Sequence, residues 1–114
     1  MELYEAYQEV NSLIAELKKE LDLCRNSGVQ LAKNEAAYRK ALRVEILNER
    51  VNGTPVTIIS DICRGKEEIA DLKCARDCSE ALYKSSQEKI NSIKLQLRLL
   101  NDEIQRTWTS GGIQ

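Results

Sequence analysis

The sequence predicts an all-α protein: a long antiparallel helical hairpin, coiled-coil-like, with a short helical connector. Apolar residues recur every three to four positions along two long segments, and turn-forming residues separate these segments at 52–55. Phe is absent, and one Trp and four Tyr supply all the aromatic bulk, which disfavours a thick globular interior. At 114 residues the chain is interpreted as one domain over 1–108, followed by a flexible tail at 109–114.

The first helix is expected over about 2–51. Its apolar residues alternate in steps of four and three, and extra apolar neighbours such as Ala6 and Leu13 widen the stripe. Gly28 is a weak point inside this helix, but strong helix formers on both sides favour an unbroken run. The predicted packing or oligomer seam of this arm is Leu3, Tyr7, Val10, Ile14, Leu17, Leu21 and Leu31.

The connector is expected to be a short helix over about 54–64. Gly53 suits the C-terminal cap of the first helix, Thr54 an N-cap, and Pro55 the first position of the new helix, which Gly65 ends. The β-branched run that begins at Val56 would also permit an extended segment. A lone strand has no visible partner elsewhere in the chain, so the helix is preferred, and an extended connector is the alternative.

The second long helix is expected over about 66–108, with acidic residues near its positive end. Its seam begins as Leu72, Ala75, Ser79, Leu82 and Ser86, and then shifts by one residue, which predicts local unwinding of a supercoil. The predicted seam residues of this arm are Leu82, Ile90, Ile93, Leu97, Leu100, Ile104 and Trp108. Because two helices bury little apolar surface, a homodimer or a higher helical bundle is expected.

The net charge is close to zero, and the sequence has no pattern typical of a membrane span or a signal peptide. Seventeen basic and 18 acidic residues nearly cancel, so no global field attracts nucleic acid or a membrane. No apolar run is long enough to span a bilayer, and the N-terminus lacks the pattern of a signal peptide. A cytoplasmic protein with reduced cysteines is therefore expected.

No catalytic, cofactor-binding or metal-binding residue is predicted, so the protein is not expected to be an enzyme. The absence of His removes the commonest general base, and no Gly-rich phosphate loop occurs. Cys63, Cys74 and Cys78 could form a thiolate metal site for a metal-dependent enzyme, but their spacing is unlike zinc motifs. The favoured interpretation is that these thiols are small buried packing residues.

Two sets of residues are candidate binding sites. The connector offers a possible protein-binding set, namely Thr54, Pro55, Ile59, Asp61, Arg64 and Lys66. A locally basic stretch offers a possible nucleic-acid-binding set, namely Arg39, Lys40, Arg43, Lys84 and Lys89. Interspersed glutamates and the lack of aromatic residues among these bases favour an ordinary solvated face over a nucleic-acid site.

About two thirds of the chain, from Tyr38 to Trp108, resembles a known group of proteins. The similar segments are YRKALRVEILNERVNGTPVTIISDICRG, KEEIADLKCARDCSEALYKSSQEKI and SIKLQLRLLNDEIQRTW. They are similar to small uncharacterised helical proteins encoded in early gene blocks of phages and prophages of Gram-positive bacteria. The resemblance implies a viral protein that acts in the host cytoplasm by binding. It implies either inhibition of a host defence or replication machine, or nucleic-acid binding in phage recombination or replication, and it does not identify the target.

Overall fold

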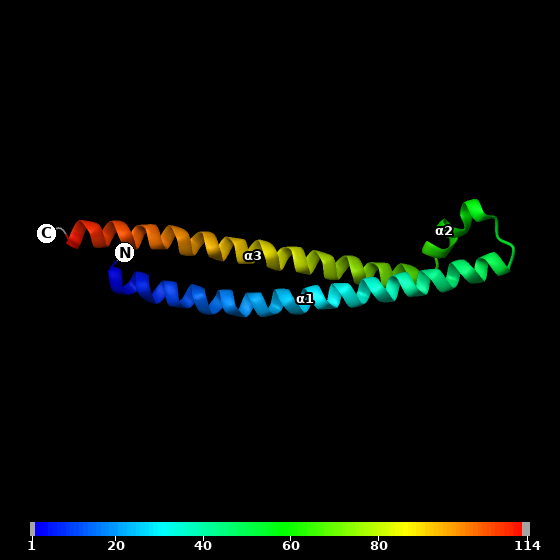
Figure 1. Cartoon of the computed structure of the whole chain (residues 1–114), viewed down its shortest axis with the longest axis horizontal. Helices are drawn as coiled ribbons and strands as arrows, with labels where there is room; N and C mark the ends of the chain where they lie inside the picture. The colour runs from blue at the N-terminus through cyan, green and yellow to red at the C-terminus, as the bar shows by residue number, and fades with distance from the viewer. Residues whose placement is uncertain (1, 113–114) are drawn as a thin grey trace. The chain divides into compact units, whose positions relative to one another are not determined.

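The computed structural model describes residues 2–112 and contains three helices in that range, with no strand (Figure 1). They are α1 (Leu3–Val51), α2 (Val56–Arg64) and α3 (Glu67–Gly112). The all-α prediction and the helical connector are confirmed. The predicted end of the second long helix at 108 is wrong, because α3 continues to Gly112, and the last two tail residues lie outside the described range.

Contacts divide the chain into two compact units. Unit 1 combines α1 up to Arg25 with α3 from Lys84 onward, and unit 2 is the continuous segment 26–83. In each unit a segment of α1 lies beside an antiparallel segment of α3 (Figure 1). The hairpin topology is thus present in both units.

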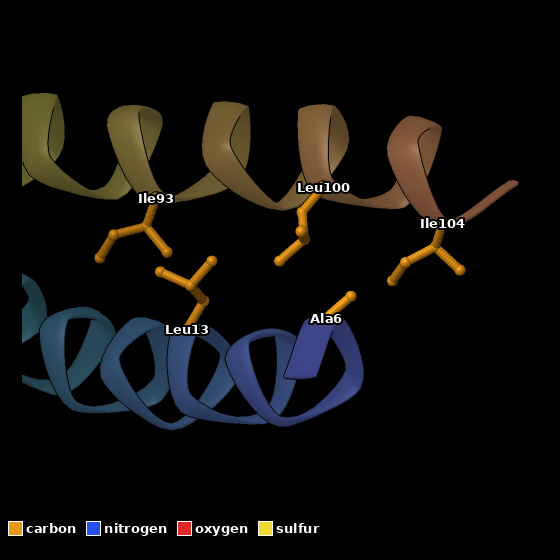
Figure 2. Close-up of a cluster of buried hydrophobic side chains, with 5 residues drawn as sticks. All are labelled: Ala6, Leu13, Ile93, Leu100 and Ile104. Carbon is orange, nitrogen blue, oxygen red and sulfur yellow. The ribbon is translucent and has the colours of Figure 1, made fainter. Parts of the chain in front are cut away.

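The core of unit 1 is a short row of aliphatic side chains between α1 and α3 (Figure 2). The spacing of three and four residues places these side chains on the facing sides of the two helices. Burial of each large aliphatic side chain contributes roughly 1.5–3 kcal/mol. The buried members are Ala6, Leu13, Ile93, Leu100 and Ile104, and Leu3, Val10, Leu17 and Leu97 pack against them.

The α1 seam differs from its predicted register at every second position. Tyr7, Ile14 and Leu21 are 52, 37 and 46 % exposed, so they do not form the contact with α3. The buried positions are instead one residue earlier, at Ala6, Leu13 and Glu20. The predicted and the buried positions follow the same spacing of three and four residues. Contacts with α3 therefore determine which of the two sets is buried. The result is a second apolar stripe on α1 that unit 1 leaves uncovered.

The predicted shift in the seam of α3 does not occur. Leu82 is 66 % exposed and Ala75 is also exposed, whereas Arg76 and Tyr83 are partly buried. With these two residues the spacing is unbroken, so no local unwinding is required. Trp108, predicted to end the seam, is 62 % exposed. The seam of α3 runs through Ile69, Leu72, Arg76, Ser79, Tyr83, Ser86, Ile90, Ile93, Leu97, Leu100 and Ile104.

Helix α1 ends in a Schellman turn at Gly53. This confirms the prediction that Gly53 forms the C-terminal cap of the first long helix. Gly53 has φ 83°, and its N–H donates to the carbonyl of Arg50 at 3.1 Å. The N–H of Thr54 donates to the carbonyl of Glu49 at 3.1 Å, which satisfies a second terminal carbonyl. The prediction that Thr54 caps α2 is wrong: its hydroxyl donates to the Glu49 carboxylate, and Pro55 takes the N-cap position.

Ion pairs and buried side chains join the three helices of unit 2. Lys66 precedes α3 and donates to the carboxylates of Glu45 and Glu49 near the end of α1, at 2.7 Å each. The amphipathic α2 buries Ile59 and Cys63. The chain reversal is therefore held on both sides of the connector.

Candidate functional site: a cationic groove in unit 2

All three helices of unit 2 contribute to one groove of about 420 Å³, termed here the cationic groove. Four cationic side chains and one carboxylate line it, a net formal charge of +4 − 1 = +3. Tyr38 and Leu42 add an apolar surface. The charged lining residues are Glu35 and Arg39 from α1, Arg64 from α2, and Lys73 and Arg76 from α3.

Glu35 organises the positive charge of the groove. Its carboxylate accepts hydrogen bonds from Arg39 Nε at 2.6 Å and from Arg76 Nη1 at 2.8 Å. These bonds, with the Arg39 bond the larger cause, lower the pKa of Glu35 below its ordinary value. The carboxylate therefore stays ionised and holds one guanidinium from each long helix at the groove.

The Arg76 side chain is fixed from several directions. Its guanidinium lies over the ring of Tyr38, 5.7 Å from the ring centroid, and Tyr38 is itself buried. Asp77 accepts a hydrogen bond from Arg76 and a second from Lys73 at 2.9 Å. Because Asp77 has a lowered pKa, caused first by Lys73 and then by Arg76, it too remains charged. Because the Arg76 side chain is already ordered, it would lose little conformational entropy when a ligand binds.

Arg64 is the available cation of the groove. It is exposed at the end of α2, and the described part of the chain contains no hydrogen bond or ion pair of its side chain. A guanidinium carries five N–H donors in a planar fork that matches a carboxylate or phosphate. Arg64 thus presents unused donors beside cations that are already positioned.

Two of the other predicted connector residues are engaged inside unit 2. Lys66 is held by Glu45 and Glu49, and its pKa is raised, first by the hydrogen bond to Glu45 and then by that to Glu49. Thr54 donates to the same Glu49, whose pKa is lowered by Lys66 first and by Thr54 second. These groups hold the connector in place.

The remaining connector residues differ in exposure. Ile59 is 4 % exposed and is a core residue, so it does not present a surface to a partner. Pro55 and Asp61 are exposed and lie outside the lining of the cationic groove. Of the predicted protein-binding set, Arg64 alone lines the groove.

The predicted nucleic-acid-binding residues are divided between the two units. Arg39, Lys40 and Arg43 belong to unit 2, and Lys84 and Lys89 to unit 1. Arg39 pairs with Glu35. Lys89 lies 3.3 Å from Glu20 and 3.9 Å from Glu16. Carboxylates therefore already neutralise part of this set.

The cysteines differ from their expected packing role. Cys63 is fully buried, but Cys74 and Cys78 are exposed on α3, so the interpretation of these two as buried residues is wrong. Cys24 is half-buried, and all four thiols are free. Over residues 2–112 no group of three or more His, Cys, Asp or Glu side chains is arranged to hold a metal ion. The three-thiol site considered from the sequence is not assembled.

Sequence reasoning missed most of the groove lining. Glu35, Tyr38, Lys73 and Arg76 were in no candidate set, although Arg39 and Arg64 were. The available signal was the unbroken spacing of α3, which places Arg76 in the seam and therefore against α1.

None of the three helices described has an apolar stretch long enough to cross a membrane. Comparison of the chain with protein-family models, with curated proteins and with solved structures found no match.

Proposed function

We propose that this chain is a non-enzymatic protein that acts by binding a protein partner, and that the cationic groove receives an acidic segment of that partner. One observation carries the proposal: Arg64 has unused donors in a groove of about 420 Å³, beside three further cations that Glu35 and Asp77 hold in place. A carboxylate side chain of the partner would accept two parallel N–H bonds from such a guanidinium. Tyr38 and Leu42 offer contact to apolar atoms of the same segment.

An acidic peptide suits the site better than a nucleic acid. The predicted nucleic-acid set is divided between two units and partly neutralised by Glu35, Glu20 and Glu16. Nucleic-acid affinity depends on many simultaneous phosphate contacts, whereas a short acidic segment needs only a few cations. Nucleic-acid binding is kept as an outcome of the test below.

Homo-oligomerisation is part of the same proposal. The uncovered stripe of Tyr7, Ile14 and Leu21 on unit 1 supplies apolar side chains for a second copy.

The resemblance to phage-encoded proteins supports a bacterial cytoplasmic partner for this binding activity. A component of a host defence or replication machine is the partner we propose. A protein without catalytic chemistry acts on such a machine by occupying a surface, so the proposal requires binding only.

The groove is tested directly with a fluorescein-labelled hexaglutamate peptide in a fluorescence anisotropy titration at low salt. Wild-type protein is expected to bind, and added salt is expected to weaken binding because exposed charges are screened. Arg64→Glu should weaken binding by about tenfold or more, equivalent to about 1.4 kcal/mol. Arg98→Glu is the matched control, since it makes the same charge reversal at an exposed position of unit 1.

Each outcome decides the proposal. Peptide binding that Arg64→Glu weakens and Arg98→Glu preserves supports the groove. Equal binding by both variants, or no binding by wild type, overturns it. A labelled oligo-thymidylate that binds wild type more tightly than the peptide would favour the nucleic-acid alternative.

A further inference from the structure

Cys74 and Cys78 form an exposed thiol pair on α3. They are four residues apart, so they occupy one face of the helix with Cβ atoms about 5–6 Å apart. Both thiols are free and exposed. The pair is therefore adjacent and accessible, and it is unlike Cys63, whose thiol is fully buried.

The two thiols line a second groove of unit 2, of about 440 Å³, termed here the dithiol groove. Ala70 and Ala81 contribute only methyl groups, so no large side chain covers the sulfur atoms. The charged residues of its lining are Arg64, Lys73 and Asp77. Two cations and one carboxylate thus surround the thiols.

The number of ligands decides which ion fits. Structural zinc is held by four protein ligands, and the described residues supply no third His, Cys, Asp or Glu to complete a site. Thiolates are soft ligands that select ions such as Cu(I), whereas the carboxylate oxygen of Asp77 is a hard ligand that such ions disfavour. A soft ion that binds with only two ligands could be held by the thiolates of Cys74 and Cys78 alone.

We propose that Cys74 and Cys78 form a two-thiolate binding site for a soft, two-coordinate cation of the Cu(I) type. Metal–sulfur bonds of about 2.3 Å place the two sulfur atoms up to about 4.6 Å apart when the metal lies between them. Cβ atoms separated by one helical turn accommodate that distance without a change in the helix.

Charge balance favours the same ion. Two thiols lose their protons to solvent and one Cu(I) enters, so the bound group carries −2 + 1 = −1. Lys73 and Arg64 lie in the same groove and offset this charge. Because proton release accompanies binding, the apparent affinity should rise with pH, by about tenfold per pH unit for each proton released.

The test is a competition for Cu(I) supplied as its coloured bicinchoninate complex, under anaerobic conditions, with reduced full-length protein. Wild type is expected to remove one Cu(I) per chain, seen as loss of the chelator complex's absorbance. Cys74→Ser and Cys78→Ser should each weaken binding by about a hundredfold or more. Cys24→Ser removes a half-buried thiol of unit 1 and serves as the matched control, with wild-type affinity expected. Circular dichroism of each variant checks that helicity is retained.

Three results would overturn the site. They are the absence of Cu(I) transfer to wild type, wild-type affinity in folded Cys74→Ser or Cys78→Ser, and half an ion per chain with dimer formation. The last result would indicate a site bridged between two copies. Failure of this site and failure of acidic-segment binding are distinguishable, because Cys74→Ser and Cys78→Ser leave every cation of the cationic groove in place.

Discussion

Ser86 Oγ donates a hydrogen bond of 2.8 Å to Glu20 Oε1, and both side chains are buried in the seam of unit 1. Lys89 Nζ lies 3.3 Å from the other carboxylate oxygen of Glu20. An acidic residue thus takes a position that an apolar one would normally fill. Its partners on α3 explain why Glu20 faces that helix while Leu21 remains exposed.

The first prediction concerns acid pH. The hydrogen bond from Ser86, followed by Lys89, lowers the pKa of Glu20 below 4.5. A group whose pKa is depressed on folding contributes stability above its unfolded pKa, and this contribution is lost as the pH falls through the folded value. Wild-type Tm should therefore fall between pH 5 and pH 3, as measured by circular dichroism, and Glu20→Gln should lose less Tm over that interval.

Glu9→Gln is the control for this experiment, because Glu9 is an exposed carboxylate on the same helix. It should keep the wild-type pH dependence. If Glu20→Gln shows the same acid-induced loss of Tm as wild type, the carboxylate does not stabilise the seam in its ionised form.

The second prediction concerns the close approach of Gly28 and Tyr83 in unit 2. A Cβ at Gly28 would lie 3.1 Å from Cε1 of the Tyr83 ring. Ala is favoured over Gly inside a helix by about 1 kcal/mol. Gly28→Ala should therefore change the free energy of unfolding little in wild type, because the crowded ring offsets the helical gain.

In a Tyr83→Ala background the same substitution should stabilise by about 1 kcal/mol, because the ring is gone. Urea unfolding of the four proteins gives the coupling between the two positions. Identical effects of Gly28→Ala in both backgrounds would show that the ring does not contact this position.

The third prediction concerns the ion pairs of Lys66. Lys66→Met removes a cation that two carboxylates share, which leaves Glu45 and Glu49 facing each other. Tm should fall at low salt, and the deficit should shrink at high salt because the repulsion is screened. Lys40→Met, an exposed position on α1, should leave Tm unchanged. An equal Tm for Lys66→Met and wild type would mean that the connector is held by packing alone.

The fourth prediction concerns the uncovered stripe of unit 1. Ile14→Glu places a charge in the middle of the stripe and should convert the proposed oligomer to a monomer in analytical ultracentrifugation, with helicity retained. Lys18→Glu also changes charge on α1, at an exposed polar position, and should leave the mass unchanged. A wild-type protein that sediments as a monomer at high concentration would contradict the oligomer proposal.

The helices were predictable because their signals are local. The cap residue Gly53 ended α1 as expected, and spacing identified both long arms. The sequence did not fully determine which face of α1 packs against α3. The stripes through Leu13 and through Ile14 share the same period and differ by one residue, so only contacts such as that of Glu20 with Ser86 distinguish them.

The candidate site could be predicted only in part. Arg39, Arg64 and Arg76 come from three different helices, and no pattern within one helix indicates that they meet. Arg76 also occupies a seam position that an apolar residue would ordinarily take, which produced the mistaken shift in α3. Cys74 and Cys78 are exposed because neither residue lies on the seam of α3.

The unbroken seam of α3, from Ile69 to Ile104, restricts how the length of this hairpin can vary. Removal of one residue would rotate everything after it by about 100°, turning aliphatic side chains toward solvent. Removal of seven residues would restore the facing direction, but only a matching loss from α1 would keep the two arms paired. Natural variants of different length should therefore gain or lose residues in multiples of seven, with the same change in α1 and in α3.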